Sequence, residues 1–490
     1  MVDTVRPEPS RLYRWAVLVF ISVAMGGNYY IYDSINPLER IFIEKLGYSA
    51  TAFGWLNSSY SVAAVLTLLI GGIVIDRIGT KKAITFFAVL CLLGAALTAA
   101  RGQAGVMIAG RTILGLGAES MIVAVTTALA KWFKGKELSF AFGINLTIAR
   151  LASVAADNSP TWAHRAFYPN GSSGEPSWQG PLFIAVGAGV LAVVCSLIYW
   201  GFETRAERRY ELGQAGSIDK LEFGQIFRIR GLTLKHAIVH IWRGLMEFLR
   251  FNPSYWFVVG LCFTFYSAIF PFRTFAIDFF TNKILAAHSG ALSASEAIKQ
   301  AGFCNSLLPF TAMIATPLFG LLVDKVGKRA LLMMLGSLLL MPVYLMMAYL
   351  SASRIVTFAV PWISGWHFTV LHVTLPLLML ITMLMMGISF SLIPAVMWPS
   401  VAYIVDQARL GTAYALMTVF QQIGFFLLNL LIGNANDYAH AGLDHPGGYA
   451  LGMWIFSILG FVGMTFAILL RVRETGPHGH RLETITIGKE

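Results

Sequence analysis

The 490-residue chain has little charge: Asp, Glu, Lys and Arg together make up 12% of it. That is about half of the share found in ordinary soluble domains. Hydrophobic residues make up 57% and aromatic residues 13%. A chain this long cannot cover its surface in water with so few charged side chains, so a soluble globular protein is excluded. The composition predicts an all-α membrane protein that crosses the bilayer many times.

Cysteine is also scarce. Cys91, Cys195, Cys262 and Cys304 are isolated within apolar runs and form no CxxC or mixed His/Cys pattern. We therefore expect neither disulfides nor a metal site. The sequence has no P-loop and no nucleophile–histidine–acid pattern, and its ten histidines lie mostly in loops. These absences indicate a protein that is not an enzyme and that needs no cofactor.

The net charge of +11 does not indicate nucleic-acid binding, because most basic residues lie in short loops between apolar runs. In that position they set the orientation of a membrane protein, and their distribution predicts that both termini are cytoplasmic. The polar, basic N-terminal segment has no cleavable signal pattern. We therefore expect the protein to contact membrane lipids and not to bind nucleic acid.

Twelve runs of about 20 or more predominantly apolar residues are candidate spans. They cover residues 15–37, 51–75, 82–101, 105–130, 138–160, 180–203, 254–276, 299–323, 329–350, 374–398, 408–434 and 447–471. A long basic stretch separates the sixth from the seventh. The chain is thus expected to comprise an N-terminal six-helix bundle (1–203), a cytoplasmic linker (204–253), a C-terminal six-helix bundle (254–473) and a cytoplasmic tail (474–490).

Two connecting segments have patterns of their own. Within the linker, residues 235–249 carry apolar residues at helical spacing and basic residues mostly on the other face. This pattern predicts an amphipathic helix on the cytoplasmic membrane surface; a calmodulin target would have a similar one. Residues 351–373 are apolar with two tryptophans, which predicts an interfacial segment on the outer side.

A short motif occurs twice, six spans apart. The loop after the second span reads GGIVIDRIGTKKA, and the loop after the eighth reads FGLLVDKVGKRA. Such duplication indicates two parallel repeats related by an axis along the membrane normal. Positive charge for orientation would explain the lysines but not the placed aspartates and glycines. We expect the charged residues to act in gating, with each aspartate accepting hydrogen bonds from a neighbouring helix N-terminus. They are Asp76, Arg77, Asp324 and Lys325.

The first of these loops resembles the signature of the major facilitator superfamily, although Thr80 stands where arginine is usual. The fourth span adds a second signature, Arg111-x-x-x-Gly115-x-Gly117. The resemblance covers nearly the whole chain. It implies the major facilitator fold, in which two bundles rock about a site at the midplane, and we count Arg111 among the gating residues.

Glu119 lies in the middle of an otherwise apolar span, where a carboxylate costs roughly 2.5 to 3.5 kcal/mol. Arg150 lies on the next span, and both are 12 residues from the basic loop between those spans. At about 1.5 Å per residue they are both expected near the bilayer midplane. An acid and a base at one depth can hold the ammonium and carboxylate groups of a zwitterion. Alternatively, the two side chains pair with each other; proton coupling by Glu119 is compatible with both interpretations.

A closer resemblance concerns the lysosomal dipeptide exporter branch of the superfamily. Residues 115–153 and 391–424 are similar to the corresponding stretches of that branch. There, the matching glutamate and arginine hold the amino and carboxyl ends of a dipeptide, which implies those roles for Glu119 and Arg150. Because the N-terminus has no acidic dileucine sorting signal, we expect a bacterial or plasma-membrane relative, located in the plasma (inner) membrane in preference to the lysosome.

Further pocket candidates lie on the first and seventh spans. Ser22, Gly26, Tyr29, Asp33 and Asn36 recur at helical spacing and form one stripe. We expect Tyr29 to line the site and Asp33 to act in gating or proton coupling, with a polar helix end as the alternative for Asp33. On the seventh span, Tyr266 shares a face with Arg273, which either faces the solute or extends to the membrane surface.

The C-terminal half has no deep charge, so we expect it to supply hydrogen bonds and pockets for side chains. The candidates are Asn305, Trp398, Tyr414, Thr418 and Gln421. Trp398 and Gln421 are assigned to the substrate site, although a single tryptophan more often packs against its neighbours.

Together these features predict a monomeric secondary transporter that moves dipeptides or similar small zwitterions by alternating access, with protons as a candidate second solute. One alternative is a proton-coupled organic-anion carrier, in which Arg150 binds the substrate and Glu119 only couples protons. Another is a membrane receptor that has the fold but does not transport.

Overall fold

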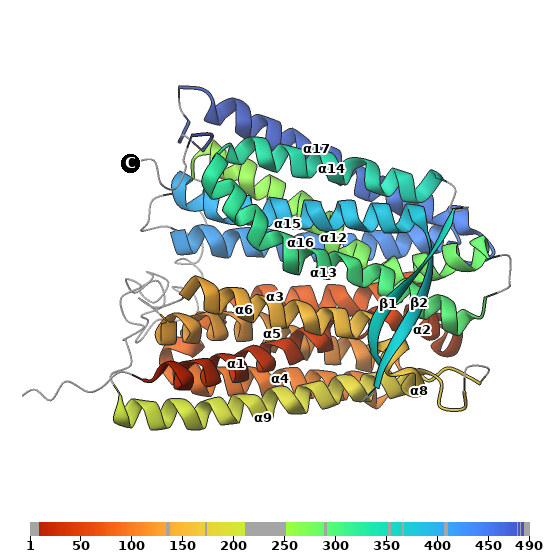
Figure 1. The fold of residues 1–490 in the computed structure, drawn as a ribbon, viewed down its shortest axis with the longest axis horizontal. Helices are drawn as coiled ribbons and strands as arrows, with labels where there is room; N and C mark the ends of the chain where they lie inside the picture. The colour runs from red at the N-terminus through yellow and green to blue at the C-terminus, as the bar shows by residue number, and fades with distance from the viewer. Residues whose placement is uncertain are drawn as a thin grey trace, which may run out of the picture.

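The computed structural model describes residues 9–133, 138–171, 174–210, 251–288, 292–350, 354–364, 367–405, 410–477, 479–480 and 482–484. Within these ranges, twelve helices of 20 or more residues run side by side in two groups of six (Figure 1). Ten segments of the described ranges are long and apolar enough to cross a membrane. The other two long helices, Ala50–Ile78 and Leu138–Asp157, complete the twelve that the sequence predicts.

The N-terminal half contains α1 (Arg11–Asp33), η1 (Asn36–Leu38), α2 (Glu39–Leu46), α3 (Ala50–Ile78), α4 (Thr80–Ala100), α5 (Ala104–Phe133), α6 (Leu138–Asp157), α7 (Ser159–Trp162), α8 (His164–Phe167) and α9 (Gln179–Arg209). The C-terminal half contains α12 (Pro253–Ala287), α13 (Ala294–Val326), α14 (Arg329–Tyr349), β1 (Ile355–Ser364), β2 (His367–Pro376), α15 (Leu377–Ile404), α16 (Leu410–Tyr438), η3 (Pro446–Tyr449) and α17 (Ala450–Glu474). The predicted amphipathic helix at 235–249 lies outside the described residues.

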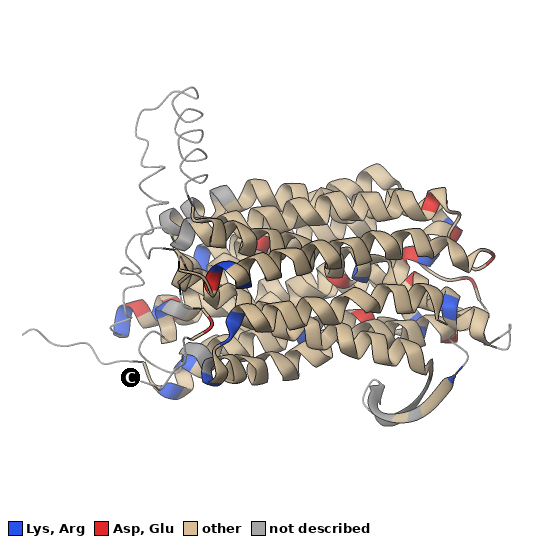
Figure 2. Cartoon of the chain, turned by 90° about the horizontal axis from the view of Figure 1, so that it is seen from above, with Lys and Arg blue, Asp and Glu red and all other residues tan. Residues whose placement is uncertain are grey.

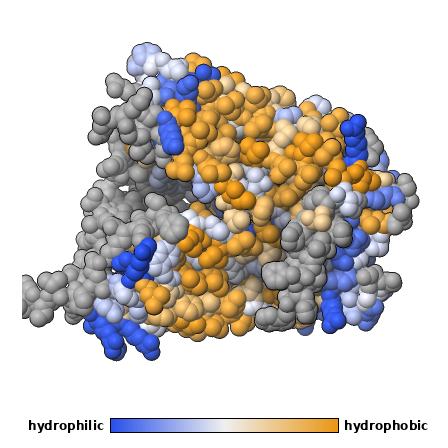
Figure 3. Space-filling model, in the orientation of Figure 1, coloured by the Kyte–Doolittle hydropathy of each residue, from blue (hydrophilic) through white to orange (hydrophobic). Residues whose placement is uncertain are grey.

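Charged residues gather at the two ends of the helices (Figure 2), and apolar side chains dominate the surface between them (Figure 3). Large apolar side chains such as Leu66, Phe183 and Leu318 are 56–60% exposed. A surface of this kind is stable only against lipid acyl chains. We call the end that carries Arg11 and Glu474 the terminal end, and the opposite end the far end (Figure 1).

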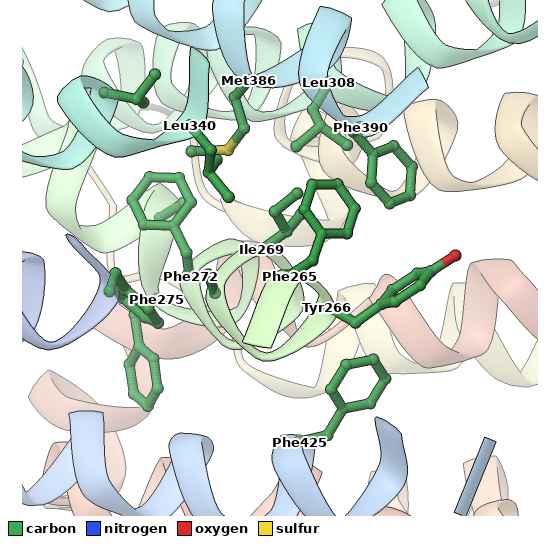
Figure 4. Packing of buried hydrophobic residues seen from close by; sticks show 14 of the residues in the cluster. Phe265, Tyr266, Ile269, Phe272, Phe275, Leu308, Leu340, Met386, Phe390 and Phe425 are labelled. Atoms are coloured by element: carbon green, nitrogen blue, oxygen red, sulfur yellow. The ribbon is translucent and has the colours of Figure 1, made fainter. Parts of the chain in front are cut away.

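The core of the C-terminal half is built around α12. Phe272 packs edge-on against Phe280, Tyr344 and Phe456, with ring centroids 5.5–6.0 Å apart. Figure 4 shows this cluster continuing to Phe265 and Phe390, while the hydroxyl of Tyr266 points out of it. The buried aromatic rings fix α12 against its neighbours, and Tyr266 presents its polar tip elsewhere.

The two halves touch closely toward the far end, where α3 lies against α16 and α6 against α13. Glycine makes these approaches feasible. A Cβ at Gly433 would lie 2.6 Å from the carbonyl oxygen of Ala50, and a Cβ at Gly54 or Gly302 would overlap a backbone carbonyl of the facing helix. The far end is therefore closed by direct backbone packing.

Both copies of the repeated motif turn at a glycine. Gly79, between α3 and α4, has a φ of 79°, and Gly327, between α13 and α14, has a φ of 68°. These left-handed conformations favour glycine, which accounts for its presence in both loops. The side chains of Asp76, Arg77 and Asp324 lie outside the described residues, and Lys325 is exposed at the terminal end.

Strands β1 and β2 pair in the antiparallel sense, and we call this pair the hairpin; the sequence does not predict strands in the segment assigned to the interface. Ile355 pairs with Pro376 at its base. Ile355 and Thr357 are exposed while Leu375, on the opposite face, is buried. Since β1 contacts α7 and β2 contacts α13 and α15, the hairpin spans both halves near the far end (Figure 1).

Candidate substrate site between the two bundles

Glu119 extends from α5 toward two hydrogen-bond donors from different helices. The hydroxyl of Tyr60 on α3 donates to its Oε1 at 3.0 Å, and Nε2 of Gln422 on α16 donates to the same oxygen at 3.1 Å. Oε2 accepts no hydrogen bond from the described residues. Gln422 belongs to the C-terminal half, so the carboxylate lies where the two bundles meet and keeps one oxygen available.

Arg111 precedes Glu119 on α5 by about two helical turns. Arg111 is 1% exposed, and its Nη1 donates to the carbonyl oxygens of Ile31 and Tyr32, in the last turn of α1, at 3.3 and 3.2 Å. Its Cζ lies 5.7 Å from the ring centroid of Tyr60, the residue that holds Glu119. Arg111 is thus an anchor for α1 and for the aromatic ring that positions the carboxylate. Its gating role stays a prediction.

Arg150 on α6 is placed between two aromatic rings. Its Cζ lies 5.8 Å from the ring centroid of Tyr29 on α1 and 5.4 Å from that of Phe390 on α15. Within the described ranges it makes no hydrogen bond or ion pair, and in particular none with Glu119. A cation over aromatic rings gains roughly 0.5–2 kcal/mol. That is less than a guanidinium needs to offset desolvation, so Arg150 retains its capacity for an anion.

Two of the aromatic residues expected at the site, Tyr29 and Tyr266, lie near Arg150, and the third, Trp398, contacts Tyr266. Glu119 and Arg150 both lie close enough to Tyr29 to act on it electrostatically, and Tyr266 lies close to Arg150 and to Tyr29. The indole Nε1 of Trp398 donates to the hydroxyl of Tyr266 at 2.9 Å. The structure therefore brings together five of the six residues assigned to the substrate site.

The sixth, Gln421, is half-buried and makes no hydrogen bond with the described residues, whereas its neighbour Gln422 binds Glu119. Gln422 is 2% exposed, and its buried Oε1 has no hydrogen-bond partner in the part of the chain that the structure describes. Gln421 follows Thr418, another candidate on the same helix, by three positions, and Gln422 follows it by four. Both spacings return to the same helix face, so the pattern could not decide between the two glutamines.

Asp33 and Arg273 lie in a buried ion cluster closer to the far end. Nη2 of Arg273 contacts Oδ2 of Asp157 at 2.8 Å, and its Nη1 lies 3.5 Å from Oδ1 of Asp33. Asn305 donates to the other oxygen of Asp157 at 2.9 Å. Arg273 and Asn305 come from the C-terminal half and both aspartates from the N-terminal half. Arg273 thus does not extend to the membrane surface, and its partner Asp157 is not among the residues that the sequence singles out.

We also examined the described residues for a metal site and for disulfide bonds. No group of three or more His, Cys, Asp or Glu residues there is arranged to hold a metal ion. The four cysteines are buried and unpaired.

Comparison with known proteins fits this arrangement. The Major Facilitator Superfamily profile matches residues 18–371, and that of the MFS_1 like family matches residues 293–481. The chain belongs to the major facilitator superfamily. It is accordingly an integral multi-pass membrane protein and a transporter, not an enzyme.

Three similar proteins are informative. The lysosomal dipeptide transporter MFSD1 of Danio rerio is 29% identical over 433 residues, 87% of this chain and 81% of the relative. The hexuronate transporter of Escherichia coli is 24% identical over 229 residues, 44% of this chain and 51% of the relative. A bacterial homolog of the human lysosomal transporter Spinster, solved in an inward-facing and unoccupied conformation, has a TM-score of 0.65 and 15% identity, covering 94% of this chain and 98% of that one.

Proposed function

We propose that the protein transports dipeptides or similar small zwitterions, with Glu119 binding the ammonium group and Arg150 the carboxylate. The observation that carries the proposal is that these two charged side chains lie near Tyr29 and do not pair with each other. Two opposite charges at membrane depth would normally neutralise one another. Holding them apart on uncharged partners has a cost that a zwitterion bound between them would offset.

The hydrogen-bonding capacity of the site matches the two ends of such a substrate. An ammonium group has three donors, and Oε2 of Glu119 and Oε1 of Gln422 are acceptors without partners among the described residues. The planar fork of Arg150 suits a carboxylate, which it can bind bidentately. Tyr29, Tyr266 and Trp398 offer apolar surface for side chains. The similarity to a dipeptide transporter supports the same assignment.

Alternating access would proceed by separating the halves at the far end. The contacts between halves include Asp33 and Asp157 with Arg273, and Asp437 with the start of α3. With both termini in the cytoplasm, as the loop charges predict, the closed far end would face the outer side of the membrane. Breaking these contacts and closing the motif loops of Asp76 and Asp324 would give the outward-facing state. We place the protein in a plasma or inner membrane.

An organic-anion carrier is the second candidate. Two observations favour it. The chain is similar to a hexuronate transporter, and no carboxylate among the described residues pairs with Arg150. In that case the ammonium group is unnecessary, and Glu119 would serve only for proton coupling. The two candidates differ in whether removing the negative charge of Glu119 abolishes binding.

Thermal stabilisation of the purified protein separates them. We would test dipeptides, amino-blocked dipeptides, free amino acids and hexuronates on the wild type, Glu119→Gln and Arg150→Ala. A ligand at 100 times its Kd stabilises the native state by about 2.7 kcal/mol and raises Tm. The proposal requires that unblocked dipeptides stabilise the wild type but neither variant. It fails if only anions stabilise and Glu119→Gln still responds.

Gln421→Ala is the matched control, because this half-buried side chain precedes Gln422 and makes no hydrogen bond in the described ranges. It should respond to dipeptides as the wild type does. Flux of the stabilising ligand into liposomes then distinguishes a transporter of that substrate from a protein that only binds it.

A further inference from the structure

The most unusual side chain outside the substrate site is that of Glu39, the first residue of α2 at the far end. It is 2% exposed, and its Oε2 is buried without a hydrogen-bond partner. Within the described ranges Glu39 makes no hydrogen bond or ion pair at all. Because a buried carboxylate without a partner is strongly destabilising, Glu39 is not expected to be ionised in this conformation.

Other carboxylates face Glu39 from the C-terminal half. Asp278 on α12 and Asp437 on α16 are close enough to act on it electrostatically. The two oxygens of Asp437 accept from the backbone N–H groups of Ala50 and Thr51 at the start of α3, both at 2.8 Å. A helix N-terminus favours a negative charge at that position. The surroundings of Glu39 are therefore anionic.

The groups around Asp278 do not supply a cation to Glu39. Asp278 accepts from the hydroxyl of Tyr449 on η3 and from Nδ2 of Asn282 on α12. Oδ1 of Asn282 in turn accepts from Nη1 of Arg40 at 2.9 Å, while Nε of Arg40 binds Glu44 at 2.7 Å.

Lys45, the other base on α2, pairs with Glu175 at 3.1 Å. Both basic residues of the helix that carries Glu39 are thus committed to other carboxylates. A proton is the simplest species that neutralises Glu39.

We propose that Glu39 is a proton-binding site that is occupied while the far end is closed and vacated when the two halves separate. Separation moves α12 and α16 away from α2 and admits water, so the carboxylate ionises and releases its proton to the far compartment. The closed far end binds one proton more than the open one, so acid on that side stabilises the closed state. Linkage limits the effect to a tenfold change in the closed-to-open ratio per pH unit.

This proton site rests on alternating access between the bundles, and not on the identity of the substrate. It can therefore be tested without any substrate. A failure would leave the dipeptide proposal intact, and a failure of the dipeptide proposal would leave the proton site intact.

The test measures the distance across the far end by double electron–electron resonance on full-length protein in nanodiscs. Spin labels are attached at Gln103→Cys in the N-terminal half and Leu443→Cys in the C-terminal half, both exposed positions. The four native cysteines are buried, so they do not compete for label. The closed fraction is followed from pH 8 to pH 5 at constant sodium concentration in the wild type, Glu39→Gln and Glu44→Gln.

We expect the closed-to-open ratio of the wild type to rise several-fold to tenfold per pH unit over part of this range. Glu39→Gln, which is always neutral, should stay predominantly closed at every pH. Glu44→Gln, a carboxylate on the same helix that is 46% exposed, should behave as the wild type does.

The proposal is overturned if Glu39→Gln retains the full pH response, or if the ratio of the wild type follows sodium at fixed pH. Infrared difference spectra give a second measurement, in case Glu39→Gln fails to fold. The C=O band of a protonated carboxyl should disappear when the wild type opens. Persistence of all such bands would also overturn the proposal.

Discussion

Replacing Gly433 by alanine should open the far end. A Cβ at this position would lie 2.6 Å from the carbonyl oxygen of Ala50 and 2.9 Å from Cα of Thr51. Carbon atoms pack comfortably at about 3.5 Å or more, so the start of α3 would have to move by about 1 Å. The same two residues donate their N–H groups to Asp437, and the displacement would strain both bonds.

The magnitude follows from the cost of overpacking, which is typically about 1–3 kcal/mol for an added methyl or methylene group. The clash exists only while α3 and α16 touch, so this free energy disfavours the closed state alone. The closed-to-open ratio should fall by about 5- to 150-fold. Spin labels at positions 103 and 443 report this ratio directly.

Gly187→Ala is the control. Gly187 lies within α9, and among the described residues no heavy atom comes within 4 Å of a Cβ built there. In both Gly187→Ala and Gly433→Ala, alanine stabilises the helix by roughly 0.5–1 kcal/mol relative to glycine. Only Gly433→Ala introduces a clash. Our reasoning would be refuted if both variants gave the same distance distribution, since the contact would then relax locally without coupling to closure.

Three further predictions concern single side chains. Gln422→Ala should weaken dipeptide binding by about 1–3 kcal/mol, because it removes both a hydrogen-bond donor to Glu119 and an acceptor for the ammonium group. Isothermal titration calorimetry measures this loss of affinity, and the control Gln421→Ala should show no loss. Arg273→Met should lower the free energy of unfolding by about 3–5 kcal/mol, because it leaves the buried carboxylate of Asp157 without its ion-pair partner. Thermal melting should show a lower Tm, and the additional change Asp157→Asn should restore most of the lost stability. Trp398→Phe removes the indole donor of a 2.9 Å hydrogen bond and should cost about 1 kcal/mol of substrate affinity, while an unchanged affinity would exclude this hydrogen bond from binding.

Much of the fold is predictable from sequence because membrane spans are long and uniformly apolar. The duplicated loops of Gly79 and Gly327 also predict the two halves, since each loop needs a residue that tolerates positive φ. The hairpin at 355–376 was not foreseen. Its β-branched and aromatic residues are compatible with a strand, but a short apolar run carries no periodicity that separates a strand from an interfacial segment.

The candidate site was predictable only in part. Glu119 and Arg150 stand out because charge is costly at membrane depth. Their surroundings could not be inferred, since Tyr60 lies 59 residues and Gln422 303 residues from Glu119 along the chain. Asp157 escaped notice for the same reason: its significance comes from Arg273, 116 residues away, which only the folded chain brings near.

The close approaches at Gly54 and Gly302 have a consequence for mutational scans and for alignments of relatives. Any side chain at these positions would collide with the backbone of the other half. Both positions should therefore tolerate almost no substitution, although neither side chain can meet the solute. A map of intolerant positions would thus combine two sets, one that recognises cargo and one that lets the halves meet. Scoring transport rates separately from ligand affinity would tell them apart, since only the first set should alter affinity.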